Sequence, residues 1–529
     1  MPLDADHHDF PNATSLLCFR EFVSLMQNPW MTGLSNSEGR LWKDTMPQLC
    51  RSDLTLRNAA MAIGAISLWR ANTTTLDVNA TSSGAAFNTH YLQALAFYGE
   101  ALKRQNRHAS LQSAAFLSLL LVIFESIRRQ RRAALNHVNH GMALLLSFVT
   151  GPRADDNISG FAPNPRPVLA QLADVFTHLA TQTRVVLQGR VGLCSPLPDL
   201  ARGLRERDMT MDAFVLLLSR VAGQGHLVTP SVFSSLDEFE DQLVSLIRRQ
   251  AEMGPIMLRA MEDTGITESE DQQHITALFP TLLRDPNVQH FCNDTRQAME
   301  ALERAFIPLF DKVTLSTDLD SPTYLRAIHL RLRHLAVYIL NNPPQYADIE
   351  AMITLGPRFR EFVSLAEVML RVAKGFFSTN PVYRLCVDGG LAWHLLQVAL
   401  HCRDPTTRDQ ASLLLREYPG QDGLWSTRAL YALASRNRLL ERVNANGDEP
   451  QTQWQRLWRR EYYLEDGGER LVFRFLDRDG ASEEWALVEE VAELDDNAVE
   501  VEWKQQPRPT SGRLLLKEVT PCGRRDTGL

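Results

Sequence analysis

Residues 111–127 constrain the fold of this chain more than any other stretch, because they are apolar on nearly every side. Gln112, Ser113 and Ser118 interrupt the run, and it is shorter than the roughly 20 residues that a membrane-spanning helix needs. The sequence therefore predicts a central helix that is enclosed by other helices. Residues 88–105 supply one such neighbour, since their apolar side chains recur at helical spacing.

Helical spacing continues along the chain as far as residue 442. Ser321-Pro322 and Asp404-Pro405 read as helix starts, because a capping residue precedes a proline at the first helical position. The predicted fold class is all-α, a large multi-helix body of stacked helix pairs. The further helices are predicted over residues 133–148, 169–186, 211–221, 235–253, 293–313, 321–341, 357–374, 385–403, 405–418 and 424–442.

The pattern changes after residue 445. Residues 471–476 and 485–488, separated by a turn, predict a small β-hairpin, and the alternation over residues 499–503 predicts a third strand. Four parts are expected: an N-terminal tail over residues 1–14, a helical domain over 15–445, a β-hairpin module over 452–505 and a tail over 506–529.

Composition and motifs exclude several classes of protein. The 55 basic and 63 acidic residues give a formal charge of −8, which is the wrong sign for broad contact with DNA. The N-terminal residues have no secretory signal, and the seven cysteines include no Cys-X-X-Cys pair for zinc. Nucleophile elbows, phosphate-binding loops, dinucleotide fingerprints and His-Glu-X-X-His motifs are absent from the sequence. We predict no catalytic, cofactor-binding or metal residues, and that the chain is not an enzyme.

Four stretches, taken in order, resemble the fungal-specific transcription factor domain, the helical regulatory region of zinc-cluster regulators. The resemblance covers residues 15–445. The stretches are Trp42 with residues 46–62, residues 90–95 followed by 124–145, residues 233–239, and residues 386–442.

The resemblance implies an all-helical regulatory domain. It also implies DNA contact through other molecules, because the family's cluster of closely spaced cysteines has no counterpart in this sequence, and no DNA-binding residue is identified. The positions that match the family pattern are interpreted as architectural. They are Trp42, Phe124, Glu125, His137, Gly141, Cys402, Arg403, Asp404, Pro405, Gly423 and Trp425.

A basic cluster follows the predicted central helix, formed by Arg128, Arg129, Arg131 and Arg132. One hypothesis makes it a nuclear import signal or a phosphate contact. The alternative is a solvated helix exit, where positive charge is favourable. The position at a helix end favours the second interpretation.

Two groups of histidines raise the question of metal binding. His137 and His140 lie three apart on one predicted helix, and His394, His401 and Cys402 lie on another. Neither group has further ligands at helical spacing, so a metal site would be incomplete. We predict no metal, and expect hydrogen-bonded core histidines.

The leading hypothesis is a nuclear transcriptional regulator without its own zinc cluster. It would act through other transcription regulators or a homodimer partner, with DNA contacted indirectly, no membrane association and a small-molecule effector in the helical core. The resemblance favours control of a secondary-metabolite gene cluster. One alternative is a truncated or isoform product of a full DNA-binding factor. Another is a helical metabolite-binding or enzymatic protein derived from the domain.

Overall fold

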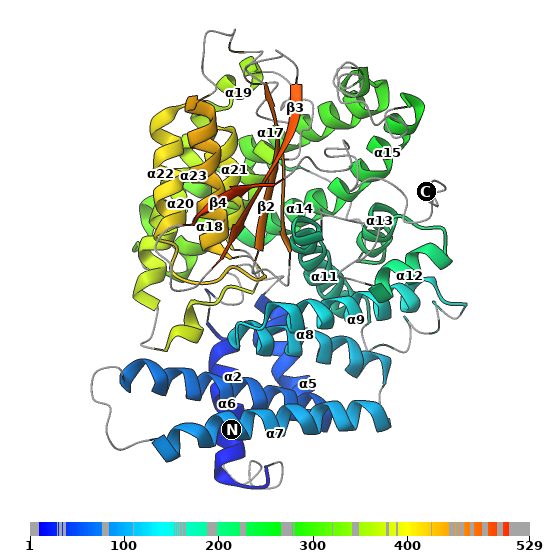
Figure 1. Cartoon of the computed structure of the whole chain (residues 1–529), viewed down its shortest axis with the longest axis vertical. Coiled ribbons are helices and arrows are strands. Elements are labelled where there is room, and N and C mark those ends of the chain that lie inside the picture. The colour runs from blue at the N-terminus through cyan, green and yellow to red at the C-terminus, as the bar shows by residue number, and fades with distance from the viewer. Residues whose placement is uncertain are drawn as a thin grey trace.

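The computed structural model consists of helices with one small sheet near the C-terminal end (Figure 1). The predicted all-α fold with a small C-terminal β module is confirmed. No helix among the described residues is long and apolar enough to cross a membrane. The structure describes residues 10–28, 30, 34, 39–76, 84–108, 110–152, 154, 156, 158, 161, 165–187, 198–222, 229–265, 278, 281–319, 321–340, 349–376, 380–387, 390–424, 426–443, 450, 454, 460–465, 470–478, 485–494 and 501–506.

Helix α8 (Leu111–Ile127) is the central helix that the sequence predicts. Every residue from 114 to 127 is buried. Helices α6 (Leu54–Leu76) and α9 (Arg131–Thr150) pack against it, and α7 (Gly84–His108) packs along α6. A helix that is apolar all round must be covered all round, and these neighbours supply much of that cover.

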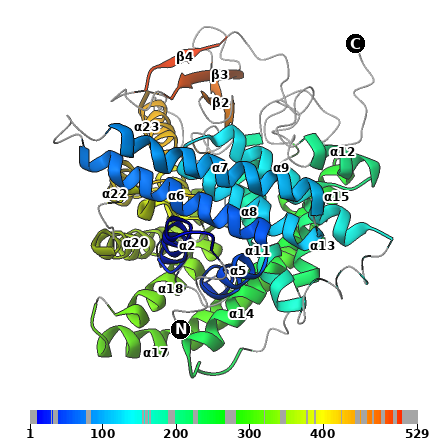
Figure 2. The ribbon, with the colours of Figure 1, turned by 90° about the horizontal axis from the view of Figure 1, so that it is seen from below.

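The N-terminal helices form one end of the molecule, and the helices from α17 onward form the other (Figure 1). Seen from below, α6 and α7 lie in front (Figure 2). The other helical elements are α2 (Ala13–Met26), the π-helix η2 (Leu41–Thr45), α5 (Met46–Ser52), α11 (Pro165–Leu187), α12 (Pro198–Glu206), α13 (Met211–Ala222), α14 (Leu236–Arg249), the 3-10 helix η3 (Gln250–Glu252), α15 (Met253–Asp263), α17 (Pro286–Ser316), α18 (Pro322–Leu340), α19 (Ile349–Thr354), α20 (Gly356–Phe376), the 3-10 helix η6 (Pro381–Arg384), α21 (Ala392–His401), α22 (Pro405–Arg416) and α23 (Thr427–Val443).

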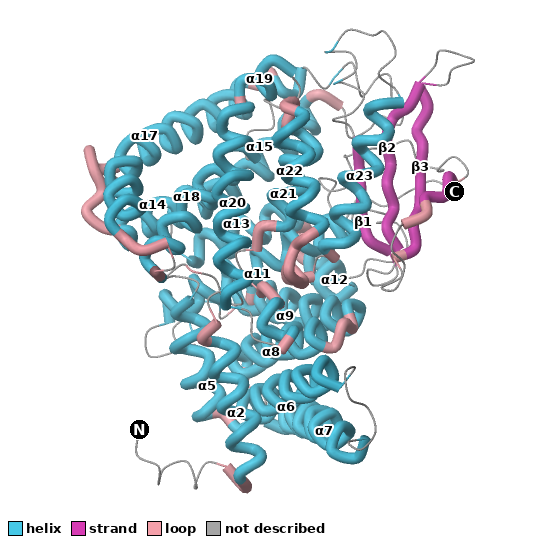
Figure 3. The backbone as a smooth tube through the Cα atoms, turned by 90° about the vertical axis from the view of Figure 1, so that its left-hand side faces the viewer, coloured by secondary structure: helices cyan, strands magenta, loops and turns pink. Residues whose placement is uncertain are grey.

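The sheet is antiparallel, with strand order β1-β2-β3-β4, and lies beside α23 (Figure 3). Its strands are β1 (Arg460–Glu465), β2 (Arg470–Arg478), β3 (Trp485–Glu493) and β4 (Trp503–Gln505). The predicted hairpin is β2 and β3. Strand β1 was not predicted, and the third predicted strand contributes only from Trp503 onward among the described residues.

Hydrogen bonds attach the sheet to the helices. Arg436 Nε of α23 donates to Glu490 Oε2 at 2.7 Å, and Gln397 Nε2 of α21 donates to the Tyr462 hydroxyl at 2.8 Å. Strand β1 also packs against α11. The β module therefore covers helices of the body.

Three predicted helices are wrong in extent. The helix predicted over 293–313 is α17, which begins seven residues earlier, at Pro286, after the cap residue Asp285. Residues 385–387 are not helical, because the Cys386 amide donates to the Gln421 carbonyl at 2.9 Å and the Gly423 amide donates to the Cys386 carbonyl at 2.7 Å. Helix α21 starts only at Ala392. The predicted helix over 235–253 is instead α14, a 3-10 turn and the start of α15. Both predicted cap and proline starts are confirmed: Ser321 Oγ accepts the Tyr324 amide, and Asp404 caps α22.

Candidate functional site

The end of α8 has an unusual backbone. The Gln130 amide donates to the Glu125 carbonyl at 2.9 Å, and the Arg129 amide donates to the Ser126 carbonyl at 3.0 Å, which together form a Schellman motif. Arg129 occupies the left-handed position of the motif, with a φ of 61°. Glycine is the low-strain residue there, and another residue costs roughly 1–2 kcal/mol.

The 3-10 helix η6 lies across from the end of α8. The indole nitrogen of Trp30 donates to the Arg384 carbonyl at 3.1 Å, and Asn28 Nδ2 donates to the Tyr383 carbonyl at 3.1 Å. These bonds come from the segment that follows α2. They fix η6 against the N-terminal helices.

The start of α23 forms a third wall. The Ser426 hydroxyl accepts the Ala429 amide at 3.3 Å, and the Thr427 hydroxyl donates to the Gly420 carbonyl at 3.1 Å. Both bonds hold the first turn of α23 against the preceding loop. Arg428 follows in that first turn.

These three walls enclose a pocket of about 300 Å³, which we call the arginine pocket. Residues of α6 and of the connection from α8 to α9 line the pocket from the early part of the chain, and residues around η6 and the start of α23 line it from the late part. The pocket therefore exists only when both parts are folded together. Its lining residues are Arg70, Ser126, Ile127, Arg129, Arg131, Pro381, Val382, Arg384, Leu385, Pro419, Gly420, Gln421, Ser426, Thr427 and Arg428.

Five arginines give the arginine pocket a strongly positive lining, and none of the described residues that line it is Asp or Glu. The pKa of Arg70 is lowered, first by burial and then by the charge of Arg129, so these two guanidinium groups repel each other. Nη2 of Arg428 is buried without a hydrogen-bond partner among the described residues. The arrangement favours a bound anion.

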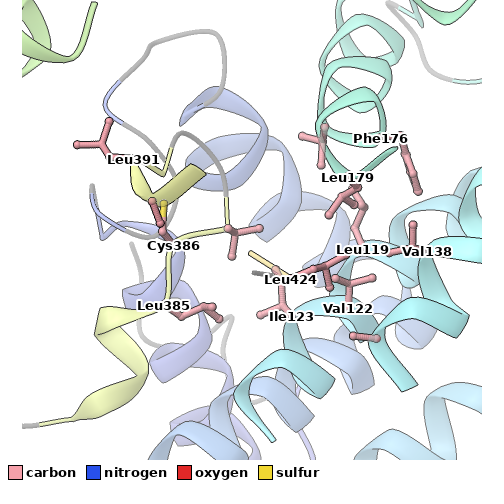
Figure 4. Close-up of a cluster of buried hydrophobic side chains, with 14 of the residues drawn as sticks. Leu119, Val122, Ile123, Val138, Phe176, Leu179, Leu385, Cys386, Leu391 and Leu424 are labelled. Carbon is pink, nitrogen blue, oxygen red and sulfur yellow. The ribbon is translucent and has the colours of Figure 1, made fainter. Parts of the chain in front are cut away.

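An apolar core lies beside the arginine pocket and supports it (Figure 4). Leu119, Val122 and Ile123 of α8 lie toward Leu385 and Leu424 from the late part of the chain. All five side chains are buried. This core brings the end of α8 to the segments around η6 and α23.

A buried carboxylate, that of Asp422, also fixes the loop next to the arginine pocket. Asp422 Oδ2 accepts the Ala392 amide at 2.9 Å, which caps α21. Burial raises the pKa of Asp422 to about 6. A side chain at Gly390 would overlap this carboxylate, and Gly423 has a φ of 54°. Both glycines are therefore required by the loop.

The structure separates the four arginines of the predicted import signal. Arg128 Nη1 donates to Glu125 Oε2 at 3.0 Å, and its guanidinium lies over the Phe124 ring. Arg129 and Arg131 line the arginine pocket, and Arg132 is exposed. Nuclear import stays a prediction. Sequence reasoning missed Arg70, Arg384 and Arg428, since each stands alone in its own segment.

His137 is hydrogen-bonded, as expected, but it is only partly buried. The Tyr98 hydroxyl is 3.2 Å from His137 Nε2, and burial lowers the pKa of His137 to about 4. His140 is instead exposed and lies 3.2 Å from a carboxylate oxygen of Asp199. The two histidines therefore serve different contacts.

The second histidine group is also part of the packing. His394 lies beside the ring of Phe362, and His401 Nε2 is 3.1 Å from Gln397 Oε1. Cys402 is fully buried. Among the residues that the structure describes, no group of three or more His, Cys, Asp or Glu side chains could hold a metal ion.

The positions interpreted as architectural lie in the core or at helix ends where they are described. Phe124 stacks on Tyr98 with ring centroids 4.8 Å apart, and a Cβ at Gly141 would lie 2.6 Å from the Phe176 ring. Trp42 is buried within the π-helix η2. Trp425 lies outside the described residues.

Comparison of this chain with models of protein families, with curated proteins and with solved structures finds no match. The function therefore has to be argued from the residues and from the arginine pocket.

Proposed function

We propose that this chain is a regulator of transcription that acts through partner proteins and responds to a small-molecule effector bound in the arginine pocket. One observation carries the proposal. The pocket is lined from two stretches that resemble the fungal-specific transcription factor domain, by Ser126 of residues 124–145 and by Gln421 and Ser426 of residues 386–442. A pocket between distant segments can couple ligand binding to their arrangement.

The partner supplies the contact with DNA in this proposal. The formal charge of −8 argues against broad DNA contact by this chain, and a second regulator or a homodimer partner would provide it. The resemblance supports a nuclear location and the control of a secondary-metabolite gene cluster.

A metabolite-binding or catalytic protein outside transcription is the second candidate. The observation that favours it is the arginine pocket itself, because a positively lined cavity suits an anionic metabolite whatever the biological setting. The two candidates differ in what the bound ligand changes, which is gene expression in one case and metabolite concentration in the other.

The test is to attach the full chain to a heterologous DNA-binding domain in a filamentous fungus and measure a reporter gene. We expect reporter output several-fold above or below that of the DNA-binding domain alone. Arg428→Met should change that output, whereas Arg371→Met, at a side chain that is 69% exposed and paired with Glu367, should not. Output equal to that of the DNA-binding domain alone would contradict the regulator and favour the second candidate.

A further inference from the structure

We infer that Asp422 makes the arginine pocket sensitive to pH, because ionisation of its buried carboxyl group releases one wall of the pocket. That wall, which we call the ladder wall, consists of residues 384–387 and 420–423. The inference rests on the proposed function only for its regulatory meaning, since it states how the effector's pocket is regulated. The movement of the wall is measured on the chain alone.

Backbone hydrogen bonds join the two segments of the ladder wall. The Cys386 amide donates to the Gln421 carbonyl at 2.9 Å, and the Gly423 amide donates to the Cys386 carbonyl at 2.7 Å. Cys386 and Asp422 thereby form an isolated parallel bridge. Asp422 is therefore the residue at the centre of the contact between the two segments.

The ladder wall is shared with the arginine pocket. Arg384 and Leu385 line the pocket from one segment, and Gly420 and Gln421 line it from the other. The two backbones approach closely at Gly420, where a Cβ would lie 2.2 Å from the Arg384 carbonyl oxygen. A change in the spacing of the two segments therefore changes the pocket itself.

The carboxyl group of Asp422 is enclosed by protein. Asp422 is 3% exposed, and a Cβ at Gly390 would lie 1.9 Å from its Oδ1 atom. Its Oδ2 atom accepts the Ala392 amide at 2.9 Å, and the Leu391 amide donates to the Tyr418 hydroxyl at 3.0 Å. Two side chains that follow α22 thus hold the start of α21.

Burial and the start of α21 act on this carboxyl group in opposite directions. The Ala392 amide and the helix dipole favour the ionised form. Burial favours the neutral form and has the larger effect, so it raises the pKa of Asp422 to about 6. The carboxyl group is therefore mostly neutral at pH 5 and mostly ionised at pH 7.

The neighbouring titratable groups keep their charge over the same range. Burial raises the pKa of Tyr418 well above its usual value and lowers that of His394 to about 4. Cysteine thiols and arginines keep their usual charge state between pH 5 and pH 7. The titratable and charged side chains on η6, on the ladder wall and at the starts of α21 and α23, among the described residues, are Tyr383, Arg384, Cys386, His394, Tyr418 and Arg428.

The enclosure couples the proton to the position of the wall. In the closed wall an ionised Asp422 is shielded from the water that would stabilise its charge, and opening the wall supplies that water. The pH thus shifts the populations of two states. An aspartate in water has a pKa of about 3.9. The ratio of open to closed wall should therefore rise about 10-fold from pH 5 to pH 7.

Cys386 can report the opening. Its thiol is 3% exposed and belongs to the buried cluster drawn in Figure 4, so a thiol reagent reaches it through opening of the wall. The experiment labels the full chain with dithiodipyridine at pH 5, 6 and 7 and identifies the labelled cysteines by mass spectrometry. Because the reactivity of any thiol changes with pH, the rate is divided at each pH by that of Asp422→Asn. We expect this quotient to rise about 10-fold from pH 5 to pH 7.

Asp404→Asn is the matched control. Asp404 also caps a helix, because its Oδ2 atom accepts the Thr407 amide at 3.2 Å, but its side chain is 32% exposed. The labelling rate of Cys386 divided by that of Asp404→Asn should not vary with pH, since both chains keep Asp422. Cys402, which is fully buried at the end of α21, separates local opening from unfolding of the whole chain. Cys386 should be labelled faster than Cys402 at pH 7.

Two results would overturn the inference: a quotient of natural chain to Asp422→Asn that stays constant from pH 5 to pH 7, or equal labelling rates of Cys386 and Cys402 at pH 7. If Asp422→Asn does not fold, hydrogen exchange of the natural chain decides. Peptides from the ladder wall should then open about 10-fold more at pH 7 than at pH 5, after correction for the intrinsic exchange rate, and equal opening would overturn the inference.

The reporter assay separates this failure from that of the proposed function. Reporter control with a constant quotient would leave a regulator whose pocket does not respond to pH. A rising quotient without reporter control would leave a pH-sensitive pocket in a protein outside transcription.

Discussion

Arginines occur in two contrasting settings in this molecule. Between α17, α18 and α20, Arg331 Nε donates to Glu361 Oε1 at 2.6 Å, and its Nη2 donates to Glu303 Oε1 at 2.7 Å. Arg358 Nη1 donates to the same Glu303 oxygen at 2.8 Å. In the arginine pocket, five arginines meet without a described carboxylate among them. The first set pairs with carboxylates, whereas the second set lines a cavity.

The contrast separates a structural role from a binding role. Charges that are paired in the folded chain contribute to holding helices together, and removing one partner exposes the other to an apolar surrounding. Like charges that face one cavity repel one another, and a ligand of opposite charge offsets that repulsion. Substitution should therefore lower the free energy of unfolding strongly in the paired set and change it little in the arginine pocket.

The largest effect is expected at the paired set. Arg331 is 3% exposed, so Arg331→Met leaves two carboxylates without their buried cation and should lower the free energy of unfolding by about 3–5 kcal/mol. Arg371→Met, at a 69% exposed pair with Glu367, should cost less than about 1 kcal/mol. Denaturant unfolding of both variants measures the difference. Equal losses of the free energy of unfolding in the two variants would contradict a structural role for the paired set.

A carboxylate next to each set gives a pH test of the same contrast. Burial opposes the charge of Glu303, but hydrogen bonds and charge from Arg358 and Arg331 lower its pKa to about 2. Burial instead raises the pKa of Asp422 to about 6, which is a shift in the direction opposite to that of Glu303. The stabilisation from ionised Glu303 is thus present above pH 4.5 and is lost as the pH falls toward 2. The stabilisation from protonated Asp422 is present below pH 3.8 and is lost as the pH rises through 6.

Asp422→Asn tests the second half of this statement. The amide oxygen still accepts the Ala392 N–H, while the buried charge is gone. Relative to the natural chain, the variant should gain about 2 kcal/mol between pH 4 and pH 7. Urea unfolding at several pH values measures this gain. A difference between the two chains that does not vary with pH would show that Asp422 titrates normally.

The helical body was predictable from sequence because its signals are local. The run over residues 111–127 is apolar on nearly every side, and Asp404-Pro405 places a cap before a proline. The segment over 385–391 was predicted as helix because its apolar residues fit that spacing. Its backbone instead pairs with Gln421 and Gly423, which are distant in sequence. Long-range backbone pairing of this kind leaves no periodic signal.

The arginine pocket was only partly predictable. The sequence showed Arg129 and Arg131 as part of a basic cluster, and the two interpretations of that cluster were a nuclear import signal or phosphate contact and, favoured by its position, a solvated helix exit. Arg70, Arg384 and Arg428 belong to segments that only the fold brings together. A local signal did exist, because a helix that ends as α8 does favours glycine at the position that Arg129 occupies. Recognising it requires the exact end of α8, which sequence patterns locate poorly.

Substitution within the arginine pocket should have a small effect on stability. Arg428→Met removes one of five like charges and keeps the apolar stem, so the free energy of unfolding without ligand should change by less than about 1 kcal/mol. Urea unfolding in Tris buffer measures it. A loss above about 2 kcal/mol would mean that Arg428 is held by a partner within the chain, and the pocket would then resemble the paired set.

Salt should have the smallest effect and depends on the same repulsion. Raising sodium chloride from about 0.02 to 0.2 M shortens the screening length to below roughly 10 Å, which weakens the repulsion among the pocket arginines. The natural chain should therefore gain a few tenths of a kcal/mol more from salt than Arg428→Met does, because the variant has one charge fewer to screen. Thermal unfolding over this range, with both chains in the same Tris buffer, measures the difference. Identical salt dependence would mean that the five guanidinium groups do not repel one another appreciably.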